Sequence, residues 1–467
     1  MSVRQIVSGV VGQFREELTN LVESSLEQPM TPDRFGEMVA GLKATLAATG
    51  RLAFVELVMA HEERGEFVDH GEKRHRFKQP SRKEWLTPFG LVQIDRRYFQ
   101  PDDGGDGVAA VDLRCGMLGR YMTPDLEEAT ALALADLSPS ATRELLGKVL
   151  VRAPSEKAIR RVVADVGGWA ENAWGEVEQR VAEEAPLPEG DTLVVSVDGV
   201  NVPMREEGLK TGRPAERPGV REKNETTTSW REAGVGTISI YNAGDGRDIA
   251  PERLATRYFA RMPEAGMKTL FDQQSCAVRE LRRERDFSGV VVICDGKQAL
   301  WKTIDEDSLY SNATQILDFF HAAEHLSRAA EAIFGKSNAK ADRWYAKYRA
   351  LLLEDEGGLD GLLRSIRYYR RQLRSASERR RIVDRVSRYF RRNRNRMRYA
   401  EFRARGLPIG SGVVEAACKS IVGTRLKRSG MRWTHEGGQH VLNLRTRARS
   451  GEWSSLWNAY QQFRLAA

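Results

Sequence analysis

Apolar residues in the first 75 positions recur every three or four residues, which is the spacing of one face of a helix. The pattern comprises Phe14, Leu18, Leu21, Val22, Leu42, Leu46, Leu52, Phe54 and Leu57. In residues 87–101 apolar and polar side chains alternate instead, as in a strand pair, and the turn residues of 101–107 indicate a loop. The first 120 residues therefore predict a helical region followed by a small β element.

Three short amphipathic segments follow, beginning near residue 123. Thr123 stands where it can cap the first segment, ahead of an acidic first turn, and the breaks between the segments suit a helix-turn-helix. The third segment carries Lys157, Arg160 and Arg161 near its start, where a recognition helix presents side chains to DNA. A helical bundle without DNA contacts gives the same pattern, so both interpretations stay open.

Two strongly apolar runs in the middle of the chain end in Asp-Gly, at Asp198 and at Asp295. A long amphipathic helix is predicted between them at about 264–284, and a third strand-like stretch turns helical near His321. Strands that alternate with helices predict an α/β core, with the two Asp-Gly ends as neighbouring strand termini. The polar, Gly/Pro-rich residues 205–229 predict an exposed loop.

Residues 322–405 predict helices throughout, and the second half of this region is unusually basic. Residues 364–398 contain fifteen arginines and two acidic residues, with tyrosines and a phenylalanine interleaved. This composition is typical of a helical surface that follows a phosphate backbone, although an ordinary charged surface helix is the alternative. The candidate DNA contacts in this tract are Arg370, Arg371, Arg379, Arg380, Arg381, Arg391 and Arg392.

Composition agrees with a nucleic-acid partner. The chain has 467 residues, a net charge of +8 and a sequence pI near 9.3, which favour an acidic partner. Its four cysteines are far apart and form no Cys-x-x-Cys pair, so neither a zinc ribbon nor a disulfide framework is indicated. The N-terminus lacks a signal-peptide core and no run approaches about 18 apolar residues. We therefore expect a cytosolic protein without a membrane span.

Three acidic residues form the strongest candidate site: Asp198, Asp295 and Glu415. Each has an ordinary alternative, since Asp-Gly often makes a turn and a glutamate in a first helical turn favours the helix dipole. If the fold brings them together, their repulsion is relieved by hard divalent ions such as Mg²⁺. Two such ions about 3.5–4 Å apart serve phosphodiester hydrolysis or strand transfer.

The residues around Glu415 suit the same chemistry. A Gly-Ser-Gly turn precedes this glutamate and lets a backbone approach closely. Nearby cationic side chains are candidates for holding DNA phosphates, and a tryptophan beyond them either packs in the core or stacks on a base. These candidates are Lys419, Arg425, Lys427, Arg428 and Trp433.

Four sequence blocks resemble the signature blocks of bacterial insertion-sequence transposases of the ISKra type. They are VSVDGVNVP, VVICDGKQALW, ILDFFHAAEHL and GSGVVEAACKSIVGTRLKRSGMRW, and the resemblance covers about 190–457. It implies an RNase H-like catalytic core, a mixed five-stranded sheet with flanking helices, interrupted by an all-helical insertion. The family's acidic triad falls on Asp198, Asp295 and Glu415. An Asp-x-x-His motif shared with Mutator-like transposases falls on Asp318 and His321 as accessory residues.

Asp318 and His321 keep a second interpretation, a hydrogen-bonded pair that braces a strand-to-helix turn. The N-terminal block LTPFGLVQIDRRYF also resembles the family. Relatives often carry paired cysteines after this β element, whereas this chain has PDDGGDG and Cys115, so we do not expect a metal knuckle there.

The resemblance implies a DNA transposase that uses two Mg²⁺ ions, with Mn²⁺ able to substitute. It would cut the ends of a mobile element, recognised through terminal inverted repeats in double-stranded DNA, and join the 3′-hydroxyl to target DNA. It would act in the bacterial cytoplasm, associated with the nucleoid when bound to DNA, as a homo-oligomer when ends are synapsed. Alternatives are a domesticated DNA-binding regulator and a nuclease that cuts without joining.

The sequence predicts six segments. They are an N-terminal helical region at 1–85, a small β element at 86–120, a helix-turn-helix-like DNA-binding region at 121–185, the first part of the core at 190–321, the basic helical insertion at 322–405, and the last part of the core with C-terminal helices at 406–467.

Overall fold

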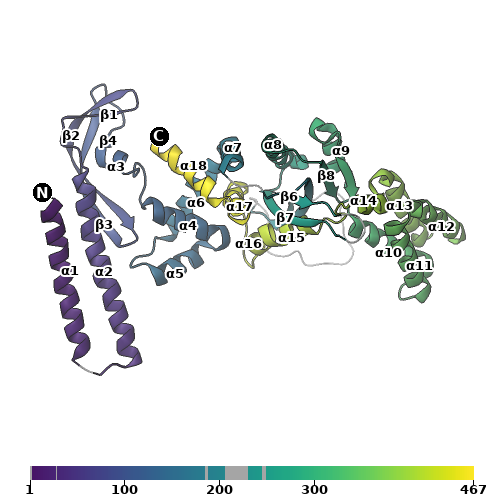
Figure 1. Ribbon diagram of the computed structural model, residues 1–467, viewed down its shortest axis with the longest axis horizontal. Coiled ribbons are helices and arrows are strands. Elements are labelled where there is room, and N and C mark those ends of the chain that lie inside the picture. The colour runs from purple at the N-terminus through teal and green to yellow at the C-terminus, as the bar shows by residue number, and fades with distance from the viewer. Residues whose placement is uncertain (1–2, 28, 185–187, 206–229, 245–248, 467) are drawn as a thin grey trace. The chain divides into compact units, whose positions relative to one another are not determined.

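The computed structural model describes residues 3–27, 29–184, 188–205, 230–244 and 249–466. The chain divides into two compact units, Met1–Trp169 with Trp457–Ala467, and Ala170–Leu456 (Figure 1). The loop predicted at 205–229 lies outside the described residues, apart from Arg205. The two units are described separately below.

The first unit combines helices with a four-stranded antiparallel sheet in the order β1-β2-β3-β4. Its elements are α1 Val3–Leu26, α2 Pro32–Ala60, β1 Phe67–His70, β2 Lys73–Thr87, β3 Gly90–Pro101, β4 Val108–Ala109 and α3 Ala110–Arg114, followed by α4 Pro124–Asp136, α5 Pro139–Val149 and α6 Glu156–Asn172. The core contains Val58 of α2 against Trp85 and Ile94 of the sheet. The end of α2 is thus held by the sheet.

Three sequence predictions for this unit need correction. Helices were predicted to about residue 75, but α2 ends at Ala60 and a strand begins at Phe67. Residues 87–101 are mostly one strand, β3, whose partner is β2 rather than a second strand within the same segment. Strand β2 is rich in lysine and arginine, and many of its side chains face solvent, so it shows little apolar alternation. The third correction concerns the expectation that no segment could span a membrane. By length and composition, helix α2 is long and apolar enough to cross one.

The three helices predicted after residue 123 are present as α4, α5 and α6. Thr123 occupies the N-cap position of α4 but makes no capping hydrogen bond with its side chain. Ser138 does cap α5, because its Oγ accepts a hydrogen bond from the Ala141 N–H at 3.2 Å. Whether these helices act as a helix-turn-helix stays a prediction.

The second unit is built on a five-stranded mixed sheet in the order β7-β6-β5-β8-β9. The strands are β5 Thr192–Pro203, β6 Trp230–Asn242, β7 Glu252–Arg261, β8 Gly289–Cys294 and β9 Thr314–Leu317. Strands β5, β6 and β7 are antiparallel, whereas β8 and β9 run parallel to β5. The unit is therefore mixed α/β, and its sheet is compatible with an RNase H-like core.

Helices make up most of the remaining chain from residue 174 onward. They are α7 Trp174–Glu184, α8 Lys268–Glu284, α9 Gln298–Glu306, α10 Phe319–Phe334, α11 Ala339–Glu354, α12 Gly358–Gln372, α13 Glu378–Arg392, α14 Tyr399–Ala404, α15 Gly412–Ala417, α16 Thr424–Leu426, α17 His435–Arg449 and α18 Trp453–Ala466, which ends in the first unit. Short 3-10 helices occupy Ala265–Met267, Ser308–Tyr310 and Arg394–Arg396, and a π-helical turn occupies Cys418–Gly423.

Helices α10 to α14 gather beside the sheet (Figure 1). Their core is continuous with one face of the sheet, because Ile293 and Ile316 belong to the same buried cluster as Leu326, Ile366 and Phe390. The predicted helical region at 322–405 is therefore helical, and it is anchored on the sheet by apolar packing.

Candidate active site

Asp198 and Asp295 lie side by side on neighbouring strands. Strands β5 and β8 are parallel, and Val197 pairs with Cys294. Each aspartate is the next residue along its strand, so the two occupy equivalent positions, with parallel strands about 4.8 Å apart. Asp295 follows the end of β8 as predicted, but β5 continues beyond Gly199 to Pro203 because it stays paired with β6. The prediction that Asp198-Gly199 ends its strand is therefore wrong, while the juxtaposition is confirmed.

Local backbone groups orient both carboxylates. Oδ1 of Asp198 accepts the Gly199 N–H at 2.7 Å, and Oδ1 of Asp295 accepts the Lys297 N–H at 2.9 Å. Burial raises the pKa of Asp295, and the charge of Asp198 raises it further against the opposing effects of the Lys297 N–H and its ammonium. A half-buried carboxylate beside a second carboxylate favours a nearby cation.

Glu415 lies in the first turn of α15 and shares a pocket with Asp198. The pocket has a volume of about 660 Å³. Its walls are formed by Asp198, Gly199, Val200, His321, Glu415, Cys418, Lys419, Gly423, Thr424 and Lys427. The structure thus brings two of the three predicted acids to one pocket, and the strand register sets the third beside Asp198.

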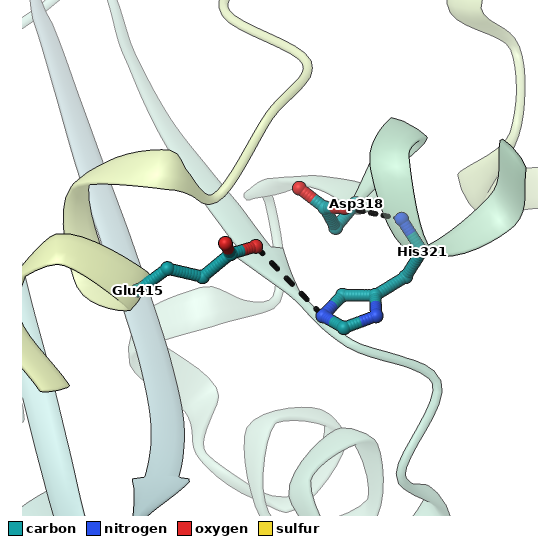
Figure 2. A group of neighbouring side chains, drawn as sticks. All are labelled: Asp318, His321 and Glu415. Carbon is teal, nitrogen blue, oxygen red and sulfur yellow. Dashed lines mark hydrogen bonds and ion pairs between the residues drawn. The ribbon is translucent and has the colours of Figure 1, made fainter. Parts of the chain in front are cut away.

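A second cluster joins Glu415 to Asp318 and His321, with one potential ligand atom from each lying within 4.8 Å of the others (Figure 2). His321 Nε2 lies 3.9 Å from Glu415 Oε1. Asp318 is fully buried, and its Oδ1 accepts the His321 backbone N–H at 2.7 Å while its Oδ2 accepts the Ser411 N–H.

These contacts divide the roles of Asp318 and His321. Asp318 caps α10 and ties that helix to the Gly-Ser-Gly turn before Glu415, so both of its oxygens are occupied by backbone donors. The bracing interpretation therefore describes Asp318, although the bond is to the backbone of His321 and not to its ring. The His321 ring lines the pocket and faces Glu415.

Two charged residues of the site escaped the sequence analysis. The Lys297 ammonium lies 2.7 Å from Glu232 Oε1 and 3.9 Å from Asp295 Oδ2. Burial alone would lower the pKa of Lys297, but its hydrogen bond to Glu232 and the charge of Asp295 raise it. Lys297 directly follows Asp295-Gly296 and could have been noticed there. Nothing in the sequence around Glu232 indicates a site residue, because only the pairing of β6 with β5 brings it to the site.

Tyr389 connects the basic helix α13 to the loop of Asp295. A Cβ atom added to Gly296 would lie 2.1 Å from Tyr389 Cε2, so the close approach requires glycine. The Tyr389 ring stacks on His325, with centroids 3.9 Å apart. Burial raises the pKa of Tyr389, and the charge of Asp295 contributes. This tyrosine is one of those interleaved with the arginines of the basic tract, but its ring packs against His325 and Gly296 inside the protein.

The predicted DNA contacts in the arginine tract differ in their surroundings. Arg370 pairs with Asp384, and Arg379 donates to the Ala332 carbonyl at 2.5 Å. Arg380 donates to Leu373 O and Arg381 pairs with Glu378. The exposed members of the set include Arg371, Arg391 and Arg392. Part of the tract therefore holds the helices together, and part faces solvent.

The candidates after Glu415 also divide into two groups. Lys419 and Lys427 line the pocket. Arg425 is buried over the Trp433 ring at 5.1 Å, and Trp433 Nε1 donates to Leu426 O at 2.9 Å. Arg428 Nε donates to Thr424 O at 2.7 Å. Of these candidates the two lysines thus share the pocket of Asp198 and Glu415, and Trp433 is partly buried against Arg425.

In the first unit, Lys157, Arg160 and Arg161 are exposed on α6. Arg160 lies 3.4 Å from Glu156, and Arg161 lies 3.4 Å from Asp165, each one helical turn away. Exposed pairs of this kind are weak, so they leave the side chains available to other partners.

No family model matches the chain, and no curated protein matches it. Among solved structures, the chain is similar to the Drosophila P element transposase strand transfer complex, with 12% identity and a TM-score of 0.24. The match covers 75% of this chain and 84% of that chain. Because so low a TM-score does not establish a common fold, we base the functional proposal on the chain's own residues.

Proposed function

We propose that the protein is a DNA transposase of the ISKra type with an RNase H-like catalytic core. It would cut the ends of a mobile element in double-stranded DNA and join the freed 3′-hydroxyl to target DNA. The observation that carries the proposal is the pairing of Val197 with Cys294, which sets Asp198 beside Asp295, while Asp198 and Glu415 line one pocket.

The donor set fits hard divalent cations. Carboxylate oxygens are the ligands that Mg²⁺ prefers, and the raised pKa of the half-buried Asp295 is that of an acid whose charge a cation would stabilise. Asp198, Asp295 and Glu415 would hold two Mg²⁺ ions, with Mn²⁺ as a substitute. When bound, such ions activate a water or hydroxyl and stabilise the leaving oxygen.

The chain's own residues would orient the DNA around these acids. Lys419 and Lys427 line the pocket as phosphate partners for the scissile strand. The His321 ring faces Glu415 and can hold it in one orientation. Asp318 would act indirectly, by fixing the turn from which Glu415 projects.

Asp198→Asn and Glu415→Gln test the proposal. Both changes keep the size of the side chain and remove its charge, so cleavage of a duplex carrying the element end should fall by at least about 10³-fold, on the scale of lost electrostatic stabilisation. Binding of the same duplex, followed by fluorescence anisotropy, should change little. Glu306→Gln, an exposed acid at the end of α9, is the matched control. Wild-type cleavage by either site variant would refute the assignment.

The products distinguish transposition from the alternatives. A strand-transfer assay with a pre-cut element end should give joined products that require added Mg²⁺ or Mn²⁺. Cleavage without joined products would identify a nuclease that cuts only. Specific end binding without metal-dependent cleavage would identify a regulator that has kept the acids but not the reaction.

A further inference from the structure

An arginine-lined pocket lies at the edge of the sheet beside β9. It has a volume of about 370 Å³, and Thr314 and Gln315 of the edge strand form one wall. The opposite wall comes from the end of α13 and the turns on either side of α14. The lining residues are Ala313, Thr314, Gln315, Arg392, Asn395, Arg396, Arg398, Phe402 and Arg405.

The pocket carries an excess of positive charge. Four arginines and no acid are among its lining residues. Two acids pair with these arginines, because Arg396 lies 3.0 Å from Asp305 and both Arg398 and Arg405 pair with Glu401 at 3.0 and 3.9 Å. Among the residues that the structure describes, two carboxylates against four guanidinium groups leave two positive charges to be compensated.

Part of this arrangement is fixed in advance. Arg396 Nε donates to Gln315 Oε1 at 2.7 Å, and its guanidinium lies 4.2 Å from the centroid of the Trp301 ring. Arg405 donates to Thr314 Oγ1 at 3.0 Å. These two arginines brace the edge strand, although Arg405 is itself exposed, as are Arg392 and Arg398 at the rim. A ligand would therefore need to order only the two rim side chains.

A second cavity adjoins the arginine-lined pocket beside helix α9. Arg392 and Arg396 line this second cavity, together with residues of α9, which are Gln298, Trp301, Lys302, Asp305 and Glu306. Helix α9 begins three residues after Asp295. The second cavity therefore mixes three basic and two acidic side chains along the helix that follows this aspartate.

We propose that Arg392, Arg396, Arg398 and Arg405 form a phosphate-binding site. Guanidinium groups bind phosphate oxygens through paired, charge-assisted hydrogen bonds, and converging arginines with excess charge match a ligand that brings two or more acceptor oxygens. The phosphate group could belong to a DNA backbone or to a free phosphate or diphosphate. The site itself does not depend on the proposed function, and only the DNA source rests on it.

The test uses the full chain carrying Asp198→Asn, so that DNA remains uncut. Arg392→Gln with Arg398→Gln removes the rim charges and leaves the two bracing arginines intact. Arg282→Gln with Arg283→Gln removes the same charge from the exposed face of α8 and is the control. Calorimetric titration with inorganic pyrophosphate measures the free anion, and anisotropy of a labelled duplex across a salt series measures DNA.

The rim variant should bind pyrophosphate at least about tenfold more weakly, because each charge-assisted hydrogen bond contributes roughly one tenfold step or more. For DNA, each lost phosphate contact should reduce the slope of log affinity against log salt by about 0.9. The control should leave both unchanged. A response to pyrophosphate alone identifies a free phosphate ligand, and a response to DNA alone identifies the backbone. If neither ligand distinguishes the rim variant from the control, the site does not exist and the arginines serve only to brace β9.

Discussion

A closed ring of buried charges holds helix α17 against the sheet, and breaking this ring should cost much of the unit's stability. Glu178 of α7 lies 2.7 Å from Arg257 of β7 and 3.1 Å from Arg447 of α17. Glu452 closes the ring, at 2.6 Å from Arg447 and in contact with Arg257. All four side chains are nearly inaccessible to water, with exposed fractions between 0% and 11%.

Glu178→Gln keeps the shape of the side chain and removes one negative charge. Two buried guanidinium groups then face a single carboxylate, and removing one partner of a buried ion pair costs about 3–5 kcal/mol. That is a large share of the roughly 5–15 kcal/mol that stabilises a typical protein. Glu306→Gln should cost less than about 0.5 kcal/mol, since Glu306 is 65% exposed and pairs only loosely with Lys302.

Urea unfolding at pH 7 measures the difference. With a slope of about 3–4 kcal/mol per molar urea for a unit of this size, the midpoint of the second unit should fall by about 1 M in Glu178→Gln. Circular dichroism reports the loss of helices, and the fluorescence of Trp174, which lies under Arg447, reports the ring itself. A midpoint equal to that of the control would refute the reasoning.

The pH dependence provides an independent check. Burial alone would raise the pKa of Glu178, but the charges of Arg257 and Arg447 lower it below its ordinary value. A group whose folded pKa is depressed contributes stability that is complete above its unfolded pKa, near 4.3, and that is lost as the pH falls through the folded value. The difference between wild type and Glu178→Gln should therefore shrink progressively below about pH 4. A difference that stays constant to pH 2 would contradict the ion-pair origin.

Three further changes test how the site is positioned. Gly296→Ala places a Cβ against the Tyr389 ring, so cleavage should fall by about 10²-fold or more, and a second change of Tyr389→Ala should restore part of it in the same assay. Asp318→Ala removes the cap of α10 and the partner of the turn before Glu415, so unfolding free energy should drop by about 2–4 kcal/mol, with the thermal midpoint as the measurement. Arg445→Met removes the guanidinium that donates to carbonyls of the π-helical turn. The free energy of unfolding should therefore fall by at least about 2 kcal/mol, and cleavage should be slower.

Each of these three predictions has a result that would contradict it. Unimpaired cleavage by Gly296→Ala would show that α13 is not packed on the loop of Asp295. An unchanged thermal midpoint in Asp318→Ala would mean that water replaces both backbone contacts. If Arg445→Met is destabilised but cleaves DNA at the normal rate, the π-helical turn does not determine the position of Glu415.

Sequence patterns sufficed for the pair of aspartates because both precede a glycine at the end of a buried, β-branched run. Such runs form parallel neighbours in an α/β sheet, and their register then sets Asp198 beside Asp295. The continuation of β5 could not be predicted, since Asp-Gly has the local preferences of a turn. Pairing of Asp198 with Val235 and of Gly199 with Gly234 overrides them, and these partners come from a distant part of the chain.

The sequence placed Glu415 at the start of a helix but could not identify its neighbours. Those neighbours depend on Asp318, which bonds to Ser411 across the fold and so determines where the Gly-Ser-Gly turn lies against α10. Burial then separates the two acids by role, because Asp318 is inaccessible and has both oxygens engaged by backbone N–H groups, while the Glu415 side chain is 40% exposed. A carboxylate that performs chemistry must keep an oxygen free to face its ligand. A carboxylate that holds a turn instead engages its oxygens with backbone donors. By that criterion Glu415 is the candidate to act in the proposed reaction, and Asp318 holds the turn that positions it.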